Sequence, residues 1–327
     1  MTKWPSSEQL KEQAKPFIKY EKDKKNKIAY VTFNRPDKLN AANIGMRLLF
    51  GDICFKAGID DDVKVMVIRG EGKHFGGGGD LPEQKGMISE NFKEESLLHE
   101  FGMPMDDVKY PPPGTFRYLH TLTDFYAKAR AGDRPLQEFK KISIVEAKGY
   151  CYGWHFYMAG DADMVISSDE AMFGHPSFRY AGWGPRLWTW CEMMGYRKFA
   201  EMLFTGRPFS AKEMYDCSFV NSVVPRDKLE AETEKYAMAC SRSRPVDTVV
   251  VQKTFLELYK QYRGEYMGSL LTGFVEGSLP LMKNDKADDL VLGDKVFRDQ
   301  GLNNAVKDND ALFPADWRLS YSGRKKP

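Results

Sequence analysis

The sequence predicts an α/β fold built from repeated strand–helix–strand passes. Residues 28–33 alternate as a strand does, and from Met46 onward apolar residues recur at the spacing of one helical face. Three aspartates then turn the chain into a second strand-like run, Val63–Ile68. The same rhythm returns later without sequence identity, at residues 142–147, 153–160 and 164–167. Repeated passes of this kind are typical of α/β proteins.

Further helices are expected in the second half of the chain. Ser210 with Glu213, and Asp227 with Glu230, have the spacing of capping boxes, which predicts helix starts at about 211 and 228. Pro245 should end the second of these helices, and another is expected from Asp247 to about Arg263.

Composition narrows the class of protein. The 327 residues are 42 % hydrophobic, enough for a large core. Lys and Arg number 48 against 46 acidic residues, so the net charge is +2 and does not indicate a nucleic-acid partner. The five cysteines are scattered and form no CxxC, which favours a reducing compartment over disulfides or zinc. No signal peptide or membrane span is visible, so a cytoplasmic protein with no membrane partner is expected.

Two glycine-rich segments carry the strongest functional signal. They are Lys73–Leu81 and Lys148–His155, and each follows a strand-like run. Glycine reaches positive φ cheaply and lets backbone approach a ligand closely. The second segment opens a helix, so free amides should point out of its N-terminus. Two amides aimed at one point form an oxyanion hole, which stabilises an enolate or a tetrahedral oxyanion.

Six motifs in order extend this signal, at residues 28–41, 74–81, 148–164, 171–174, 204–211 and 219–225. On these motifs the chain resembles the crotonase (enoyl-CoA hydratase/isomerase) superfamily over roughly residues 28–260. The resemblance implies a spiral of repeated ββα units with a C-terminal helical trimerisation region. It also implies an acyl-CoA thioester substrate, with coenzyme A as part of the substrate and no separate cofactor, and a homotrimer or homohexamer.

Three parts are expected along the chain. Residues 1–26 are charged and predict an N-terminal surface arm, 27–245 the crotonase core, and 246–327 a C-terminal helical region and tail. Within the core, residues 82–141 form an insertion longer than family members need. It contains Pro111–Gly114, which fits neither helix nor central strand, and its aromatic content favours a partly ordered lid.

The resemblance also assigns site residues. It places the first oxyanion amide on Gly77 and the second on Trp154, and it puts Tyr157 and Ser177 where hydratases of the family carry two glutamates. Neither is a carboxylate, and a phenol titrates near ~10, so ordinary two-glutamate hydration is not expected. The expected substrate contacts are Lys38, Ala41, Gly76, Asp80, Gly153, Phe178 and Trp183.

Tyr157 has two interpretations. It lies about one turn inside the helix begun by Trp154, so its hydroxyl could donate a proton or hydrogen bond near the oxyanion site. Equally, it could be a packed aromatic that replaces a lost glutamate. Asp161 is on the same helical face and is the nearest carboxylate in sequence, although a hydrogen-bonded helix end explains it as well.

Ser177 and His175 form a second candidate pair. A nucleophilic serine needs an adjacent base, and His175 is two residues away. Such a pair would suggest acyl transfer, but no orienting carboxylate is evident, and bracing the loop is the commoner role for such a histidine. The remaining histidines show no metal spacing, so no metal is predicted.

Two further features of the sequence concern the size of the substrate and the binding of coenzyme A. Aromatic residues crowd the acyl side and favour a bulky or cyclic acyl group, namely Trp154, Tyr157, Phe178, Tyr180, Trp183, Trp188 and Trp190. Near the C-terminus, where relatives carry basic residues for the coenzyme A phosphates, Asp308, Asn309 and Asp310 stand instead. Lys38 and residues 324–326 could compensate.

The expected function is an enoyl-CoA hydratase/isomerase-like lyase that polarises a thioester carbonyl. Hydration, double-bond isomerisation, decarboxylation and C–C hydrolysis are all compatible with an oxyanion hole. Two alternatives stay open: a CoA-independent β-diketone hydrolase of the same fold, and a non-catalytic acyl-CoA-binding paralogue.

Overall fold

The computed structural model describes residues 5–80, 83, 111–112, 115–127, 134–180, 183–184, 186–278 and 301–324. Its larger sheet has six strands in the order β1 (Ile18–Asp23), β2 (Ile28–Phe33), β3 (Val65–Gly70), β4 (Ile142–Ala147), β6 (Met164–Ser168) and β9 (Ser222–Val224). β1 is antiparallel to β2, and all the other pairs are parallel. A smaller sheet contains β5 (Tyr150–Tyr152), β7 (Met172–Gly174) and β8 (Phe209–Ser210).

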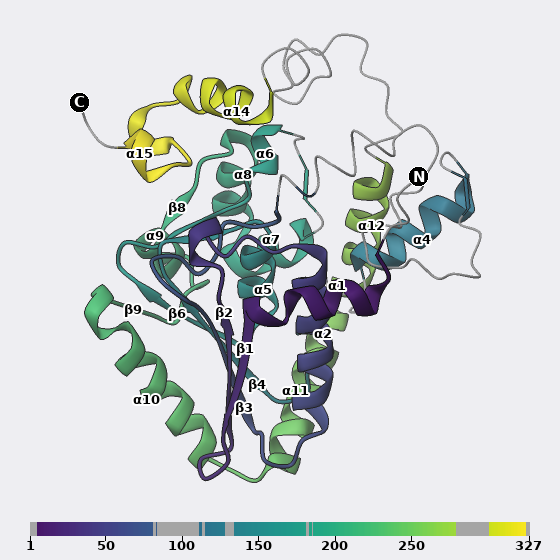
Figure 1. Ribbon diagram of the computed structural model, residues 1–327, viewed down its shortest axis with the longest axis vertical. Coiled ribbons are helices and arrows are strands. Elements are labelled where there is room, and N and C mark those ends of the chain that lie inside the picture. Colours follow the sequence, from purple (N-terminus) through teal and green to yellow (C-terminus); the bar gives the residue numbers. More distant parts are fainter. Residues whose placement is uncertain are drawn as a thin grey trace.

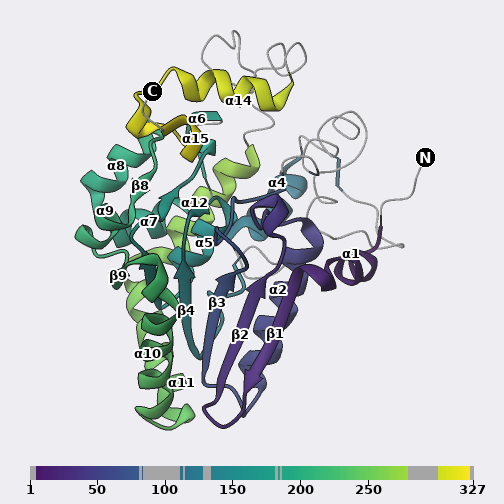
Figure 2. The ribbon, with the colours of Figure 1, turned by 60° about the vertical axis from the view of Figure 1, so that its left-hand side comes forward.

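Helices cover both faces of the larger sheet (Figure 1). They are α1 (Ser7–Ala14), α2 (Ile44–Ile59), α4 (Phe116–Ala127), α5 (Trp154–Asp161), α6 (Ser177–Tyr180), α7 (Leu187–Met194), α8 (Tyr196–Thr205), α9 (Ala211–Asp216), α10 (Leu229–Arg242), α11 (Val246–Tyr262), α12 (Glu265–Ser278), α14 (Leu302–Ala311) and α15 (Tyr321–Arg324). α14 and α15 lie at the α6 end of the molecule (Figures 1 and 2).

The period-2 pattern of the strands divides the core into two layers. In β3, Val65 and Val67 pack under α10 together with Leu229. The alternate residues Met66 and Ile68 face the larger cluster, which includes side chains from α2, α5 and α7. Because the central strands are apolar on both faces, they are buried strands of a parallel sheet.

The predicted α/β fold and its repeating rhythm are confirmed. After β4 in the large sheet the chain makes β5 in the small sheet and then α5, and β6, β7 and α6 repeat this ββα order. The predicted strands 28–33 and 142–147 agree with β2 and β4. The helix that was expected after Pro245 is α11.

The two predicted capping boxes have different outcomes. At the start of α9, Ser210 Oγ accepts from Glu213 N and the Glu213 carboxylate accepts from Ser210 N at 2.9 Å, so this box is confirmed. The Asp227/Glu230 box is wrong. A 3₁₀ turn, Arg226–Lys228, precedes α10 there, and no side chain caps that helix.

The predicted surface arm at residues 1–26 is corrected by the structure. α1 packs on α2 with Leu10 and Ala14 buried, and β1 pairs with β2 along its whole length. The close approach depends on Gly45 in α2, because a Cβ there would lie 2.1 Å from the Leu10 carbonyl oxygen. Residues 7–23 are therefore part of the folded core.

Much of the 82–141 insertion lies outside the described residues, so the lid stays a prediction. Its described helix α4 packs against α12, with Tyr118, Leu119 and Thr123 buried. In the described part of the chain, no helix has the length and apolar character needed to cross a membrane.

Candidate active site

The two glycine segments lie side by side because they leave adjacent parallel strands, β3 and β4, at the same edge of the sheet. Phe75 N donates to Lys148 O at 2.7 Å, and Gly76 N donates to Tyr150 O at 2.8 Å. Tyr152 N returns a hydrogen bond to Gly76 O at 3.0 Å. The backbone of each segment thus fixes the position of the other.

Two histidines brace this junction. His155, from the second segment, accepts a hydrogen bond on Nδ1 from Gly78 N at 3.3 Å. Its buried ring fills the space that a side chain at Gly76 would need, since a Cβ there would lie 2.1 Å from the imidazole. His74, from the first segment, accepts from Tyr150 N at 3.0 Å and stacks on the Tyr150 ring at 4.4 Å. The ring nitrogens that accept these hydrogen bonds, Nδ1 of His155 and Nδ1 of His74, are both occupied by backbone amides.

The first oxyanion amide is not available at Gly77, which corrects the sequence assignment. Gly77 N donates to Leu39 O at 2.8 Å, so this amide holds the loop against residues 36–39. The Gly76 and Gly153 amides are also engaged, with Tyr150 O and with Gly174 O.

Gly79 presents the amide that Gly77 does not. It forms a bridge with Ala42 in which Ala42 N donates to Gly78 O and Asp80 N donates to Ala42 O, so the Gly79 amide faces away from that partner. Among the described residues this amide has no acceptor. Gly79 N also lies 3.9 Å from the position that a Cβ on Gly153 would occupy. The candidate amide therefore borders the start of α5.

Gly153 and Trp154 form the second side of the candidate site. Gly153 has φ +53°, and a Cβ there would lie 3.1 Å from Gly78 Cα, so the approach of the two segments requires glycine. Trp154 is the first residue of α5, where backbone N–H groups point out of the helix. Its buried indole packs against Phe33 at 5.4 Å and Phe50 at 5.6 Å.

Tyr157 lies half-buried one turn into α5. Its ring is 5.4 Å from the His175 ring and 5.6 Å from Trp190, and the Arg186 guanidinium lies 5.1 Å from its centroid. The structure therefore places Tyr157 and His175 together, as the sequence assignment requires. The packing is compatible with both interpretations of Tyr157.

His175 and Ser177 do not form a nucleophile–base pair. His175 is buried, and neither ring nitrogen makes a hydrogen bond of normal geometry. Burial lowers the pKa of His175 to about 3, against the opposing effect of the nearby Trp183 backbone. Ser177 begins α6, and no hydrogen bond joins its hydroxyl to His175. A serine without such a partner is a weak nucleophile.

Asp161 is committed to a buried ion cluster. Arg134 Nε donates to its carboxylate at 3.1 Å, and the same guanidinium donates to Glu265 at 2.9 Å. Burial works to raise the pKa of Asp161, but the Arg134 charge and hydrogen bonds outweigh it and hold that pKa below its usual range. Of the two interpretations of Asp161, a hydrogen-bonded residue at the end of the helix therefore fits better than a carboxylate of the reaction site.

The other predicted contacts mostly support the loops. Asp80 pairs with Arg35 at 2.5 Å, and Arg35 also donates to Ala41 O at 3.1 Å. Trp183 Nε1 donates to Thr272 O at 3.2 Å. Phe178 is buried against Trp190 with ring centroids 5.7 Å apart, and Lys38 is exposed on the 3₁₀ turn Pro36–Lys38.

Sequence reasoning missed one carboxylate beside the first segment. Glu83 accepts from Ile44 N at 3.0 Å, at the start of α2, and burial raises its pKa. Its own amide donates to Asp80 at 3.3 Å. Its position three residues after Asp80 was the available signal, and its contacts give it a capping role. Across the described ranges, no group of three or more His, Cys, Asp or Glu side chains could hold a metal ion.

Two buried histidines predict a loss of stability in acid. Burial lowers the pKa of both His155 and His175 to about 3, whereas an unfolded histidine titrates near ~6.5. At pH values between these two pKa values, the unfolded chain binds protons that the folded chain does not. The free energy of unfolding is therefore highest above pH ~6.5 and falls as the pH decreases. Each histidine should cost about 2 kcal/mol of unfolding free energy near pH ~5.

Denaturant unfolding of the wild type and of His175→Phe at pH values of about 7 and 5 measures this effect. The difference between the two pH values should shrink by about 2 kcal/mol in the variant. An unchanged difference would show that His175 titrates normally in the folded protein.

Known proteins of one family are similar to this chain. The enoyl-CoA hydratase/isomerase family model matches residues 120–266. Mevalonyl-coenzyme A hydratase sidH of Aspergillus fumigatus is 27 % identical over 224 residues, which are 67 % of this chain and 70 % of that protein. Enoyl-CoA delta isomerase 2 of Rattus norvegicus is 28 % identical over 239 residues, 69 % of this chain and 52 % of that protein.

Solved structures share the fold. An enoyl-CoA hydratase from Mycobacterium smegmatis aligns with a TM-score of 0.71 and 22 % identity, over 90 % of this chain and 93 % of that one. An enoyl-CoA hydratase/isomerase from Xanthobacter autotrophicus Py2 aligns with a TM-score of 0.70 and 22 % identity, over 91 % and 98 %. The family model and the relatives, together with the motif order and the ββα repeats, support membership of the enoyl-CoA hydratase/isomerase, or crotonase, superfamily, and the solved structures show the same fold.

Proposed function

We propose that this chain is an enoyl-CoA hydratase/isomerase-like enzyme that polarises an acyl-CoA thioester carbonyl with the amides of Gly79 and Trp154. The observation that carries the proposal is the Gly79 amide, which has no acceptor among the described residues and borders Gly153 at the start of α5. Amides held in place before the substrate arrives stabilise a developing oxyanion without reorganisation. The names of the relatives, a mevalonyl-CoA hydratase and an enoyl-CoA isomerase, support a CoA thioester as substrate.

Proton handling in this proposal falls to Tyr157. Its hydroxyl is the polar group carried by α5 one turn beyond Trp154, on a ring fixed between His175 and Trp190. His175 is neutral at physiological pH because its pKa is about 3, so it supports the site as a neutral ring. The Ser177 hydroxyl supports Tyr157 in this proposal. The aromatic surroundings of Tyr157 favour a bulky or cyclic acyl group.

The substrate proposal predicts slow hydration of crotonyl-CoA. Tyr157 and Ser177 stand where the family's hydratases carry glutamates, and general acid–base assistance typically contributes about 10²–10⁴-fold. The rate should therefore fall below that of a two-glutamate hydratase by about this factor. The assay follows loss of the enoyl thioester absorbance, with a two-glutamate hydratase as the matched control. A rate equal to that control would mean that another base serves the site.

Coenzyme A dependence separates the CoA-independent C–C hydrolase from the main proposal. The acidic segment in α14 favours that alternative. Asp310 forms an ion pair with Arg179 at 2.8 Å, so this arginine is already paired with a carboxylate of the protein. Arg324 Nε donates to Arg318 O at 2.6 Å, whereas residues 325–326 lie outside the described residues. Calorimetric titration with free coenzyme A should give saturable binding. Its absence, together with cleavage of a β-diketone, would favour the hydrolase.

We further propose assembly into a trimer or hexamer. Four exposed side chains lie along α11 at helical spacing, namely Phe255, Leu258, Tyr259 and Tyr262, which are 66 %, 64 %, 52 % and 90 % exposed. Apolar side chains at this helical spacing form a contiguous stripe, and such stripes mark interaction surfaces. Light scattering should return at least three chains per particle, whereas a stable monomer would remove the claim. The cytoplasmic location stays a prediction.

A further inference from the structure

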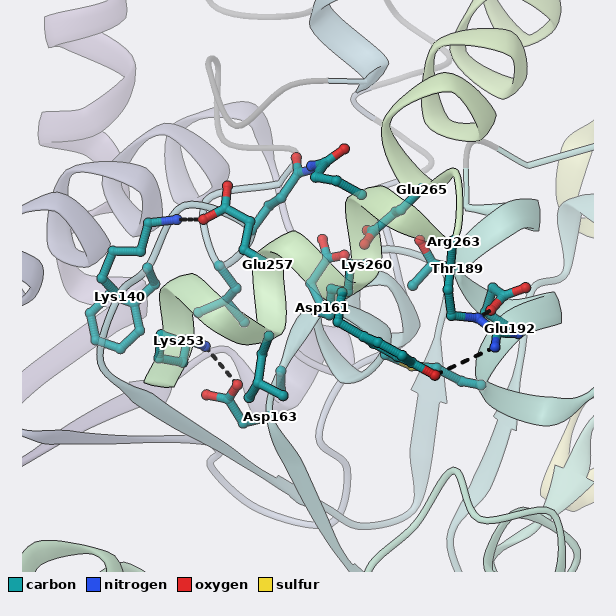
Figure 3. A pocket seen from close by; sticks show the side chains of 18 residues that line it. Lys140, Asp161, Asp163, Thr189, Glu192, Lys253, Glu257, Lys260, Arg263 and Glu265 are labelled. Carbon is teal, nitrogen blue, oxygen red and sulfur yellow. Dashed lines mark hydrogen bonds and ion pairs between the residues drawn. The ribbon is translucent and has the colours of Figure 1, made fainter. Parts of the chain in front are cut away.

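A crevice of about 450 Å³ lies between α11 and the body of the protein (Figure 3). Its walls come from α11, from α7, from residues 136–140 and from the end of α5. Asp161 lines it at the last position of α5, seven residues after Trp154. With a rise of about 1.5 Å per residue, the crevice is about 10 Å along the helix from the proposed oxyanion amides. It is therefore separate from the proposed reaction site.

α11 is attached across this crevice by ion pairs more than by apolar packing. Of its described residues only Val249 is buried. Lys253 pairs with Asp163 at 2.6 Å, and two further pairs join Lys140 to Glu257 and Arg263 to Glu192 (Figure 3). The three pairs hold the helix in place and leave the space beneath it open.

One of the cations that line the crevice forms no ion pair. Asp161 and Glu265, the two other carboxylates of the wall, share the buried guanidinium of Arg134, and the Arg186 guanidinium lies 3.8 Å from Asp161, so two arginines balance these two carboxylates. Lys260 lines the crevice from α11, is half-buried, and has no ion-pair partner in the described part of the chain. A ligand in the crevice thus meets one unmatched positive charge.

The rest of the lining is apolar enough to hold a hydrocarbon body. Leu136, Phe139 and Ala162 are buried, and Met193 is half-buried beside them. The crevice volume also falls within the range of about 300–1,000 Å³ typical of small-molecule sites.

We propose that this crevice is a second binding site, which takes an apolar monocarboxylate. The carboxylate would pair with Lys260, and the hydrocarbon would lie against Leu136, Phe139 and Met193. A dianion would need a second free cation, but Lys140, Lys253 and Arg263 are already paired. A cationic amphiphile would be repelled by Lys260, and a neutral one would leave that charge unmatched.

Calorimetric titration with octanoate tests the site on the full-length protein, with octylammonium as the charge-reversed probe. The wild type should bind one octanoate per chain and no octylammonium at this site. Lys260→Met should weaken octanoate binding by about 10–100-fold, the usual value of a charge-assisted contact. Lys260→Arg should bind within about threefold of wild type because the charge is kept.

Two further variants locate the bound octanoate. Leu256 lines the crevice and is 47 % exposed. The larger side chain of Leu256→Trp should therefore fill part of the crevice and abolish binding. Lys235→Met removes an exposed lysine on α10 and should leave binding unchanged. Thermal melts confirm that each variant is folded. Octanoate binding that survives either Lys260→Met or Leu256→Trp unchanged would overturn the proposal, as would a wild type that binds none because a neighbouring subunit fills the crevice.

Discussion

Replacing Gly79 with proline is expected to lower turnover by about 10²–10³-fold, the usual cost of losing one oxyanion donor. Proline removes the backbone N–H, and the structure gives this N–H no acceptor among the described residues, so no hydrogen bond of the fold is lost. Turnover of the best thioester substrate measures the loss, and a thermal melt close to wild type shows that the loop is intact.

Variants at Gly77 provide the matched control. Gly77→Ala keeps its amide, and the new Cβ would meet Leu39 at 3.4 Å, an ordinary contact, so activity should stay near wild type. Gly77→Pro should instead lower the melting temperature, because it removes the hydrogen bond to Leu39 O. Full turnover in Gly79→Pro with a normal melt would mean that this amide does not face the reacting carbonyl.

Tyr157→Phe is expected to lower turnover by about 10²–10⁴-fold if the hydroxyl transfers a proton. The ring keeps its contacts with His175, Trp190 and the Arg186 guanidinium, so folding and substrate affinity should change little. kcat and KM are measured separately, because loss of an interaction made only in the transition state lowers kcat at nearly constant KM.

Two comparisons make the Tyr157 result specific. Tyr236→Phe removes a phenol on α10, under the opposite face of the sheet, and should leave turnover unchanged. Ser177→Ala should cost less than Tyr157→Phe if serine only supports, and more if it is the nucleophile. Full activity in Tyr157→Phe would assign that residue to packing.

The regular elements could be predicted because local periodicity determines them. β2 alternates, β4 has apolar residues at four of its six positions, and α9 has a true capping box. The N-terminal helix and strand could not be predicted in this way. Their burial depends on Gly45, which lets the Leu10 backbone approach α2, and no local pattern reports such a distant contact.

The candidate site was predicted at the level of segments but not of atoms. Four consecutive glycines predict a sharp loop and do not say which amide remains open. That is decided by residues about 40 positions earlier, where Leu39 takes the Gly77 amide and Ala42 pairs beside Gly79. Asp161 was ambiguous for the same reason, since its partner Arg134 is 27 residues away.

The central claim is that the amides of Gly79 and Trp154 polarise a thioester carbonyl, and the direct measurement is the absorption spectrum of a bound chromophoric thioester. A conjugated aryl-enoyl-CoA such as 4-(dimethylamino)cinnamoyl-CoA absorbs at longer wavelength when its carbonyl oxygen accepts strong hydrogen bonds. At saturation, the wild type should shift the absorption band to longer wavelength, and Gly79→Pro should shift it less. A bound thioester with no shift in the wild type, or with the same shift in Gly79→Pro, would contradict the claim.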